Sequence, residues 1–343
     1  MTAWTEVREA SLRTRNTFGV DATAPVLVDV AEAAALPEVL RRFADPEPML
    51  LGGGSNLLFA GNPPGAVVAL ATRGIAIVDD DGERAVVRAD AGVAWHDFVL
   101  WTLARGLYGL ENLALIPGTV GAAPIQNIGA YGVEVRERIH AVEACDRNDA
   151  AMVRLGNADC GFAYRDSRFK REPARHVVTA VEFALSRTPA PRVEYAGIAE
   201  ELAAMGVATP TPAQVAEAVI RIRRRKLPDP AVVGNAGSFF KNPIVPAAQA
   251  EALHAEHPSL PVFHAGDDAM RKLSAAWLID RCGWKGHRDG DAGVAASHAL
   301  VLVNHGGATG AQLLGLARRI ADSVRERFGV AIEPEPRIVG ATW

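Results

Sequence analysis

The sequence predicts a protein of two or three domains that contains both helices and strands, and three observations support this. The chain has 343 residues, whereas one domain usually has about 100 to 200. Segments with strand and helix periodicity alternate along the chain, and a hairpin signature indicates antiparallel pairing as well. Apolar residues make up 49% of the sequence, which is enough for a packed core without disulfides or structural metals.

The first half of the chain begins as a small α/β unit and continues into a hairpin. Alternating polarity, glycines and turn residues set the boundaries of these elements. In chain order we expect a strand at 25–30, a helix at 31–43, a strand at 49–51, hairpin strands at 75–78 and 84–89 around Asp79-Asp80-Asp81-Gly82, a helix at 95–105 ended by Gly106, an irregular piece to about 170, and a strand at 177–185.

A turn-rich stretch at 186–191 and the prolines at 210 and 212 indicate a domain boundary. Two capping boxes, Thr211 with Gln214 and Thr309 with Gln312, each predict a helix start. The expected elements here are helices at 212–226, 247–256 and 271–281, a strand at 299–304, and a helix to about 328 with Gly329 as its C-terminal cap.

Charge and cysteine content exclude several classes of protein. The balance of 36 Lys and Arg against 40 Asp and Glu leaves a net charge of −4, so we expect no nucleic-acid partner. The three cysteines have no CxxC spacing and the nine histidines show no HExxH group, so we expect no metal site. The N-terminus lacks an apolar signal region and no stretch approaches 18 apolar residues, so we expect a cytoplasmic protein with no membrane partner.

The first chemical motif is the run Gly52-Gly53-Gly54-Ser55-Asn56. It is not a dinucleotide fingerprint, because the third glycine of G-x-G-x-x-G would fall on Leu57 and Asn62-Pro63-Pro64-Gly65 soon ends any helix. Consecutive glycines still present unshielded backbone N–H groups that can approach a diphosphate closely. The run therefore predicts either an anion-binding nest or a tight surface turn.

The second motif is the glycine-rich tract at 116–132, Ile-Pro-Gly-Thr-Val-Gly-Ala-Ala-Pro-Ile-Gln-Asn-Ile-Gly-Ala-Tyr-Gly. It has neither helix nor strand periodicity, and its small residues would pack a core poorly. Such a segment is suited to wrapping a flat, extended cofactor with backbone groups. An Ω-type loop is the alternative.

Three shorter motifs carry candidate side chains. Arg165 lies in Tyr-Arg-Asp, where neighbours can hold its guanidinium toward a carboxylate, although a solvated turn would look similar. Ser238 lies in Gly-Ser-Phe-Phe without a G-x-S-x-G elbow, so acyl transfer is disfavoured. Glu335 lies in Glu-Pro-Glu-Pro-Arg, which also fits an ordinary edge strand. The basic residues at 221–226 could bind a phosphate, and they could equally complement the dipole at the C-terminus of a helix.

Seven motifs in this order resemble the UDP-N-acetylenolpyruvoylglucosamine reductase (UDP-N-acetylmuramate dehydrogenase) family, from Asn16 to Gly340. They are GGGSN, IPGTVGAAPIQNIGAYG, YRDSRFK, KLPDP, GNAGSFFKNP, WLID and EPEPRIVG. The resemblance implies an FAD-binding fold of the vanillyl-alcohol-oxidase type, with two α+β subdomains, plus a C-terminal α+β substrate-binding domain. The implied divisions are 1–72, 73–210 with a substrate-covering tyrosine loop near 191–200, and 211–343 with its final strand, about 330–343, returning to the FAD site.

The resemblance also implies the reaction. NADPH reduces non-covalent FAD, and UDP-N-acetylglucosamine enolpyruvate then takes its place at a shared site and is reduced to UDP-N-acetylmuramate for peptidoglycan synthesis. The implied catalytic residues are Arg165 for the substrate carboxylate, Ser238 as proton donor and Glu335. The implied substrate-binding residues are Tyr164, Tyr195, Lys226 and Asn242. The implied FAD-binding residues are Gly52, Gly53, Gly54, Ser55, Asn56, Pro117, Gly118, Thr119, Gly121, Ala122, Gln126, Asn127, Gly129, Ala130, Tyr131, Gly132, Arg223 and Arg337.

Two other readings remain open at the level of sequence. One is a flavin oxidase of the same fold that uses O2 and a small alcohol, which the KLPDP and GSFFKNP segments argue against. The other is a non-catalytic flavin- or nucleotide-sugar-binding protein, which the presence of Arg165, Ser238 and Glu335 argues against. Ser297-His298 stands where some relatives would carry an amide and is left unassigned. We expect a monomer.

Overall fold

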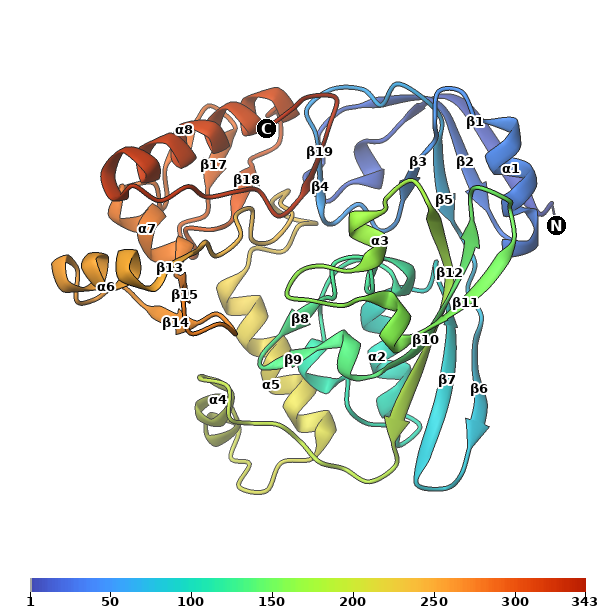
Figure 1. The fold of residues 1–343 in the computed structure, drawn as a ribbon, viewed down its shortest axis with the longest axis horizontal. Helices are drawn as coiled ribbons and strands as arrows, with labels where there is room; N and C mark the ends of the chain where they lie inside the picture. Colours follow the sequence, from blue (N-terminus) through green and yellow to red (C-terminus); the bar gives the residue numbers. More distant parts are fainter. Residues whose placement is uncertain (1) are drawn as a thin grey trace. The chain divides into compact units, whose positions relative to one another are not determined.

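The computed structural model describes residues 2–343, which form two compact units (Figure 1). The first unit comprises residues up to Ala10, Ala24–Gly53 and Pro64–Arg224. The second comprises Ser11–Thr23, Gly54–Pro63 and Arg225–Trp343. The run of glycines is thus divided between them after Gly53. The sequence-based division at 72 and 210 stays a proposal.

The first unit contains a four-stranded sheet in the order β1-β2-β5-β3. Its strands are β1 (Trp4–Ser11), β2 (Thr23–Val30), β5 (Val67–Leu70) and β3 (Met49–Leu51). The last three are parallel, as a β-α-β connection requires. The connecting helix α1 (Leu36–Arg42) is shorter than expected, because Pro37 fits only the first helical turn and a 3-10 turn precedes it.

A five-stranded antiparallel sheet in the order β11-β10-β12-β7-β6 forms the larger part of the first unit. The strands are β11 (Met152–Gly156), β10 (Ile139–Asp146), β12 (His176–Ser186), β7 (Arg84–Asp90) and β6 (Ile75–Asp80). The expectation of an irregular piece up to 170 was wrong, because residues 139–146 form a largely buried strand beside β12.

Helices cover one face of this sheet and provide its main core. The helices of the first unit are α2 (Trp95–Leu103), α3 (Arg168–Arg171), α4 (Ile198–Ala204) and most of α5 (Pro212–Lys226). Trp95 and Phe98 of α2 pack on Phe183 of β12, with ring centroids 5.9 and 4.8 Å away. Val215 and Val219, one turn apart on α5, are fully buried in the same cluster. Thr211 and Gln214 form the predicted capping box at the start of α5.

The second unit contains three small sheets and three helices. Its sheets are β13-β15-β14 (Ile244–Pro246, Met270–Leu273, Val262–His264), β16-β17-β18 (Arg288–Asp289, Ala292–Val294, Leu302–Asn304) and the parallel pair β4 (Leu57–Phe59) with β19 (Arg337–Val339). The helices are α6 (Ala247–Glu256), α7 (Ala275–Arg281) and α8 (Gly310–Phe328). The helix expected at 271–281 is wrong at its start, because β15 occupies 270–273 and Ser274 caps α7.

Candidate functional site

In the first unit the two glycine-rich motifs lie against each other. A Cβ added to Gly53 would lie 2.7 Å from the Cα of Gly118, and one added to Gly52 would lie 3.2 Å from Thr119 Oγ1. Gly52 and Gly53 are themselves exposed. Two backbones in contact with no side chain between them leave their polar groups accessible to a ligand. The structure thus brings together two motifs that are about 65 residues apart in the sequence.

Backbone hydrogen bonds fix the second motif beside the end of β7. The N–H groups of Val120 and Gly121 donate to Val93 O and Ala91 O, both at 2.9 Å. A Cβ on Gly121 would lie 2.4 Å from the Cβ of Ala91, so only glycine fits there. A 3-10 turn at Val120–Ala122 follows, and Pro117 is exposed. The tract is therefore a rigid surface rather than a loose Ω-loop.

The end of this motif is a tight hairpin of β8 (Gly129–Ala130) and β9 (Val133–Glu134). Its two turn residues, Tyr131 and Gly132, have φ values of +50° and +79°, as a type I′ turn requires. Asn127 is fully buried, and its side chain donates to Ala163 O and Glu134 Oε2. Any contact of Asn127 with a cofactor would therefore come from its backbone.

Tyr131 links this hairpin to α5 and to the tyrosine loop. Its ring meets that of Tyr195 edge to face at 5.4 Å, and Tyr195 is half exposed. Tyr131 also shares a hydrogen bond with Arg223, whose Nε donates to Leu115 O at 3.1 Å. Burial raises the pKa of Tyr131, and the Arg223 cation opposes that shift. Burial lowers the pKa of Arg223 in turn.

Arg165 is held from both ends beside the β8–β9 hairpin. Its Nη2 donates to Gly129 O at 2.9 Å, and Lys170 Nζ donates to its carbonyl at 2.8 Å. Its φ is +52°, the left-handed region, which costs a residue other than glycine about 1 to 3 kcal/mol. Neighbouring Tyr164 is exposed, with the Arg165 guanidinium 5.7 Å from its ring centroid. The surrounding hydrogen bonds therefore hold Arg165 in a conformation that it would not adopt readily alone.

In the second unit, Gly54, Ser55 and Asn56 form a turn before β4. Gly54 has a φ of +64°, and a Cβ there would lie 2.0 Å from Arg15 O. Asn56 O accepts a hydrogen bond from the Arg337 N–H at 3.0 Å, immediately before β4 pairs with β19. The structure therefore places two predicted FAD-binding positions side by side, Asn56 in the turn before β4 and Arg337 at the start of β19.

Ser238 and Glu335 also lie on adjacent backbone segments. The Glu335 N–H donates to the carbonyl of Phe239, the residue after the serine, at 2.8 Å. Both side chains are half-buried. The aromatic pair after Ser238 anchors the segment, because Phe239 and Phe240 are almost fully buried. The motif thus serves a packing role at its aromatics and leaves the serine at the edge of the core.

The predicted substrate-binding residues of this unit are Lys226 and Asn242. Asn242 Oδ1 accepts the N–H of Ala275 at 3.0 Å, in the first turn of α7. The Lys226 carbonyl accepts the Ser297 hydroxyl at 3.1 Å, so the unassigned Ser297-His298 segment lies beside this lysine. Lys226 and Lys285 both lower the pKa of His298, after burial, which is the larger cause. Lys285 was not a candidate from the sequence, because only tertiary contact brings it near His298 and Lys226.

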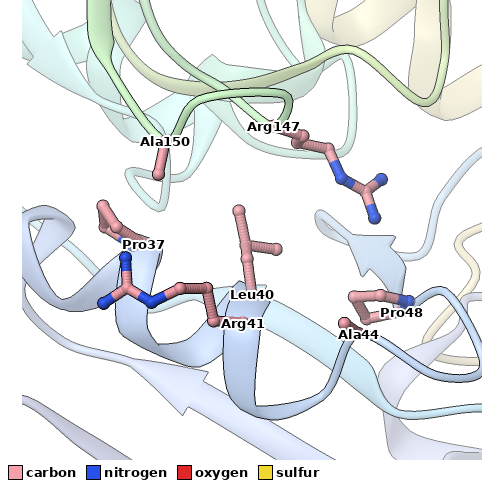
Figure 2. A pocket seen from close by; sticks show the side chains of 7 residues that line it. All are labelled: Pro37, Leu40, Arg41, Ala44, Pro48, Arg147 and Ala150. Carbon is pink, nitrogen blue, oxygen red and sulfur yellow. The ribbon is translucent and has the colours of Figure 1, made fainter.

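The first unit also has a cavity of about 180 Å³ away from these motifs (Figure 2). It is lined by Pro37, Leu40, Arg41, Ala44, Pro48, Arg147 and Ala150. Arg147 forms an ion pair with Glu47 at 2.7 Å. The cavity contains no predicted site residue and is smaller than the roughly 300 to 1,000 Å³ of typical ligand pockets.

Residues 2–343 contain no helix that is long and apolar enough to cross a membrane. Among the same residues, Cys145, Cys160 and Cys282 are free thiols.

Comparison with known proteins gives consistent matches over both units. Residues 24–156 match the model of an FAD binding domain, and residues 229–339 match that of the UDP-N-acetylenolpyruvoylglucosamine reductase C-terminal domain. The chain is 57% identical to the UDP-N-acetylenolpyruvoylglucosamine reductase of Xanthomonas axonopodis pv. citri, covering 100% of this chain and 98% of the relative. It is 56% identical to the protein of that name from Xylella fastidiosa, covering 99% and 97%.

A solved structure is also similar over the whole chain. The UDP-N-acetylenolpyruvylglucosamine reductase of Thermus caldophilus aligns with a TM-score of 0.67 and 28% identity, covering 98% of each chain.

Proposed function

The chain belongs to the UDP-N-acetylenolpyruvoylglucosamine reductase family, and on that premise we propose that it reduces UDP-N-acetylglucosamine enolpyruvate to UDP-N-acetylmuramate at the expense of NADPH. It is a flavoprotein oxidoreductase of peptidoglycan precursor synthesis, with the FAD-binding fold of the vanillyl-alcohol-oxidase type and the family's C-terminal domain. The observation that carries the proposal is the pair of glycine-rich backbones in contact at Gly53 and Gly118 within the matched FAD-binding domain.

The residues present fit FAD. A Cβ at Gly52, Gly53 or Gly121 would enter space that a neighbouring backbone or side chain already fills, so glycine at these positions keeps the cradle open and flat. We propose that residues 52–56 and 117–122 hold the diphosphate and flavin with backbone groups, and that Arg223 and Arg337 add positive charge. Bound there, FAD supplies hydride from NADPH to the terminal vinyl carbon of the substrate.

We propose that Arg165 binds the carboxylate of the enolpyruvyl group. Hydride addition at the vinyl carbon moves negative charge onto the adjacent carbon and this carboxylate, so a guanidinium already fixed by Gly129 O stabilises that charge without reorganising. Glu335, when protonated, donates a hydrogen bond to the same anion. The backbone bond from Glu335 to Phe239 sets its place beside the serine.

Ser238 is the proposed proton donor to the carbon next to the carboxylate. The hydride and this proton together saturate the double bond, so the reaction is balanced when the serine regains its proton from solvent. A hydroxyl is a weak acid, and the nearby cations of the site must stabilise its alkoxide for the transfer to occur. Tyr164, Tyr195, Lys226 and Asn242 bind the nucleotide sugar in this proposal, with Tyr195 on the loop that covers it.

The finer assignments rest on the same premise. NADPH and the enolpyruvyl sugar bind in turn at one shared site, and the protein acts as a cytoplasmic monomer. The free thiols at Cys145, Cys160 and Cys282 suit a reducing compartment.

The test is direct. The purified protein is expected to be yellow, with about one FAD released on denaturation, and to oxidise NADPH in the presence of the enolpyruvyl sugar but not with a small alcohol and O2. A protein that stays colourless in excess FAD would refute the proposal. A protein that binds FAD and the sugar nucleotide without turnover would instead support the non-catalytic alternative.

A further inference from the structure

Residues 12–20 of the second unit form an arch that a single buried side chain closes. Asn16 is 7% exposed. Its Nδ2 donates to Leu12 O at 2.8 Å and Val20 O at 3.0 Å, and its Oδ1 accepts the Val20 N–H at 3.1 Å. One amide thus joins the two ends of the arch and fixes the shape of the residues between them.

Thr17, in the middle of this arch, joins two turns through its backbone N–H and its carbonyl. The Thr17 N–H donates to Gly54 O at 3.1 Å, and Thr17 O accepts the Asn235 N–H at 2.9 Å. Gly54 belongs to the proposed FAD-binding run. Asn235 is 3% exposed, and its Oδ1 accepts the N–H of Gly237, the residue before Ser238. The same residue, Thr17, therefore touches the turn assigned to the cofactor and the turn that carries the proposed proton donor.

Close backbone packing makes this link stiff on both sides. A Cβ on Gly54 would lie 2.0 Å from Arg15 O, and one on Gly234 would lie 2.1 Å from Phe18 O. Asn304 Nδ2 donates to Phe18 O at 2.9 Å and fixes the arch to β18. Because backbone meets backbone at both contacts, no flexible side chain can absorb a shift of the arch.

We propose that Thr17 is a positioning residue, whose backbone groups hold the Gly54 turn and the Asn235–Ser238 turn at a fixed spacing and thereby place the serine relative to the bound cofactor and substrate. This inference rests on the proposed function for the roles of the two turns. Its importance follows from the sensitivity of catalysis to geometry, since a misplacement of about 1 Å can lower the rate about 10²-fold.

Two substitutions of Thr17 distinguish the role of its backbone groups from that of its side chain. Thr17→Pro removes the N–H that bonds Gly54 O, and Asn16 before it has φ −142° and ψ 143°, a conformation that a residue preceding proline adopts readily. Thr17→Val keeps both backbone groups and loses only the hydroxyl, whose contact with Gly54 O is long at 3.5 Å. Thr17→Val is the matched control.

The first measurement is hydrogen–deuterium exchange in the protein without FAD. Thr17→Pro should accelerate exchange in peptides covering residues 54–57 and also in those covering 235–239, relative to Thr17→Val. Faster exchange at residues 235–239 is the decisive result. The substitution keeps the Thr17 carbonyl that accepts the Asn235 N–H, so it can affect this turn only by displacing the arch. Acceleration confined to residues 54–57, or none, would overturn the inference.

The second measurement compares the two half-reactions by rapid mixing at saturating FAD. Thr17→Pro should slow flavin reoxidation by the enolpyruvyl sugar by about tenfold or more and raise its solvent deuterium isotope effect, with a smaller change in reduction by NADPH. Equal slowing of both steps with an unchanged isotope effect would identify a merely structural role. If Thr17→Pro fails to fold, Asn16→Ala takes its place in both measurements. If wild-type flavin is not reoxidised by the sugar, the proposed function fails and this inference with it.

Discussion

Gly53→Ala tests whether the contact between the two glycine-rich motifs forms the cofactor site. Gly53 does not have a left-handed φ, so alanine adds only a methyl group and no backbone strain. That methyl would lie 2.7 Å from Gly118 Cα and 3.2 Å from Gly118 C, whereas ordinary contact begins at 3.4 Å. The two motifs must therefore separate, and neither contact atom belongs to a side chain that can turn away.

Overpacking of this kind typically costs about 1 to 3 kcal/mol. If the strain is relieved by opening the cradle, the dissociation constant of FAD should rise about 5- to 150-fold. The assay is a titration of the FAD-free protein with FAD, followed by flavin fluorescence. Thermal unfolding of the FAD-free protein, measured alongside, separates a lost site from a lost fold.

Gly315→Ala is the matched control, because its Cβ would meet nothing within 4 Å and alanine favours the α8 helix in which it lies. Its FAD affinity should equal that of the wild type. The reasoning is refuted if Gly53→Ala also binds FAD with wild-type affinity while remaining folded. The cofactor would then have to be held elsewhere than at the contact between residues 52–53 and 118–119.

Three further predictions concern single side chains. In rapid-mixing spectra, Ser238→Ala should leave reduction of the flavin by NADPH nearly unchanged and slow reoxidation by the enolpyruvyl sugar about 10²- to 10⁴-fold. Exposed Ser259→Ala is the control. Equal slowing of both steps would show that another group donates the proton, with Glu335 as the next candidate. Lys226→Ala should raise KM for the sugar nucleotide about tenfold or more, since a charge-assisted hydrogen bond contributes about 1.5 to 3 kcal/mol. Exposed Arg325→Ala is the control. An unchanged KM would show that Lys226 does not bind the substrate. Burial lowers the pKa of His176, so as pH falls the unfolded chain takes up a proton at this histidine before the folded protein does. The free energy of unfolding should therefore fall as pH drops below about 6.5, by up to about 1.4 kcal/mol per pH unit. In urea titrations at about pH 7 and 5.5, His176→Gln should flatten this slope and exposed His264→Gln should not, and equal slopes for the wild type and His176→Gln would contradict the prediction.

Much of the fold could be predicted from local signals. The capping boxes at Thr211 and Thr309 start α5 and α8 where expected, and Gly329, with a φ of +64°, ends α8. Such signals act within a few residues and depend little on the rest of the chain. The same holds for the hairpin of β6 and β7, whose acidic turn and alternating strands are read from sequence directly.

The errors arose where distant partners decide the structure. Residues 270–273 continue the apparent helical pattern of α7 but form β15, because β13 and β14 pair with it on either side. Strands β10 and β11 were missed because their local signal is weak, and because the pairing of β10 with β12 and of β11 with β10 decides their structure.

The candidate site, like the fold, could be predicted from the sequence only in part. The motifs indicated the candidate residues, and the family resemblance implied their roles. Neither indicated that Gly53 touches Gly118, that Arg165 has a left-handed backbone, or that Thr17 bonds both Gly54 and Asn235. These contacts join segments far apart in the chain, and side-chain type alone does not encode them.

The pairing of β4 with β19 has a consequence for how the chain is made. Leu57–Phe59 is buried in the folded protein, and its parallel partner at 337–339 leaves the ribosome only after all the intervening residues. Until then β4 has an open edge of unpaired amides next to apolar side chains, the kind of surface that aggregates or recruits chaperones. We therefore expect ribosome-bound nascent chains arrested before Arg337 to be cleaved by protease near β4, and the full-length chain after release to be protected there.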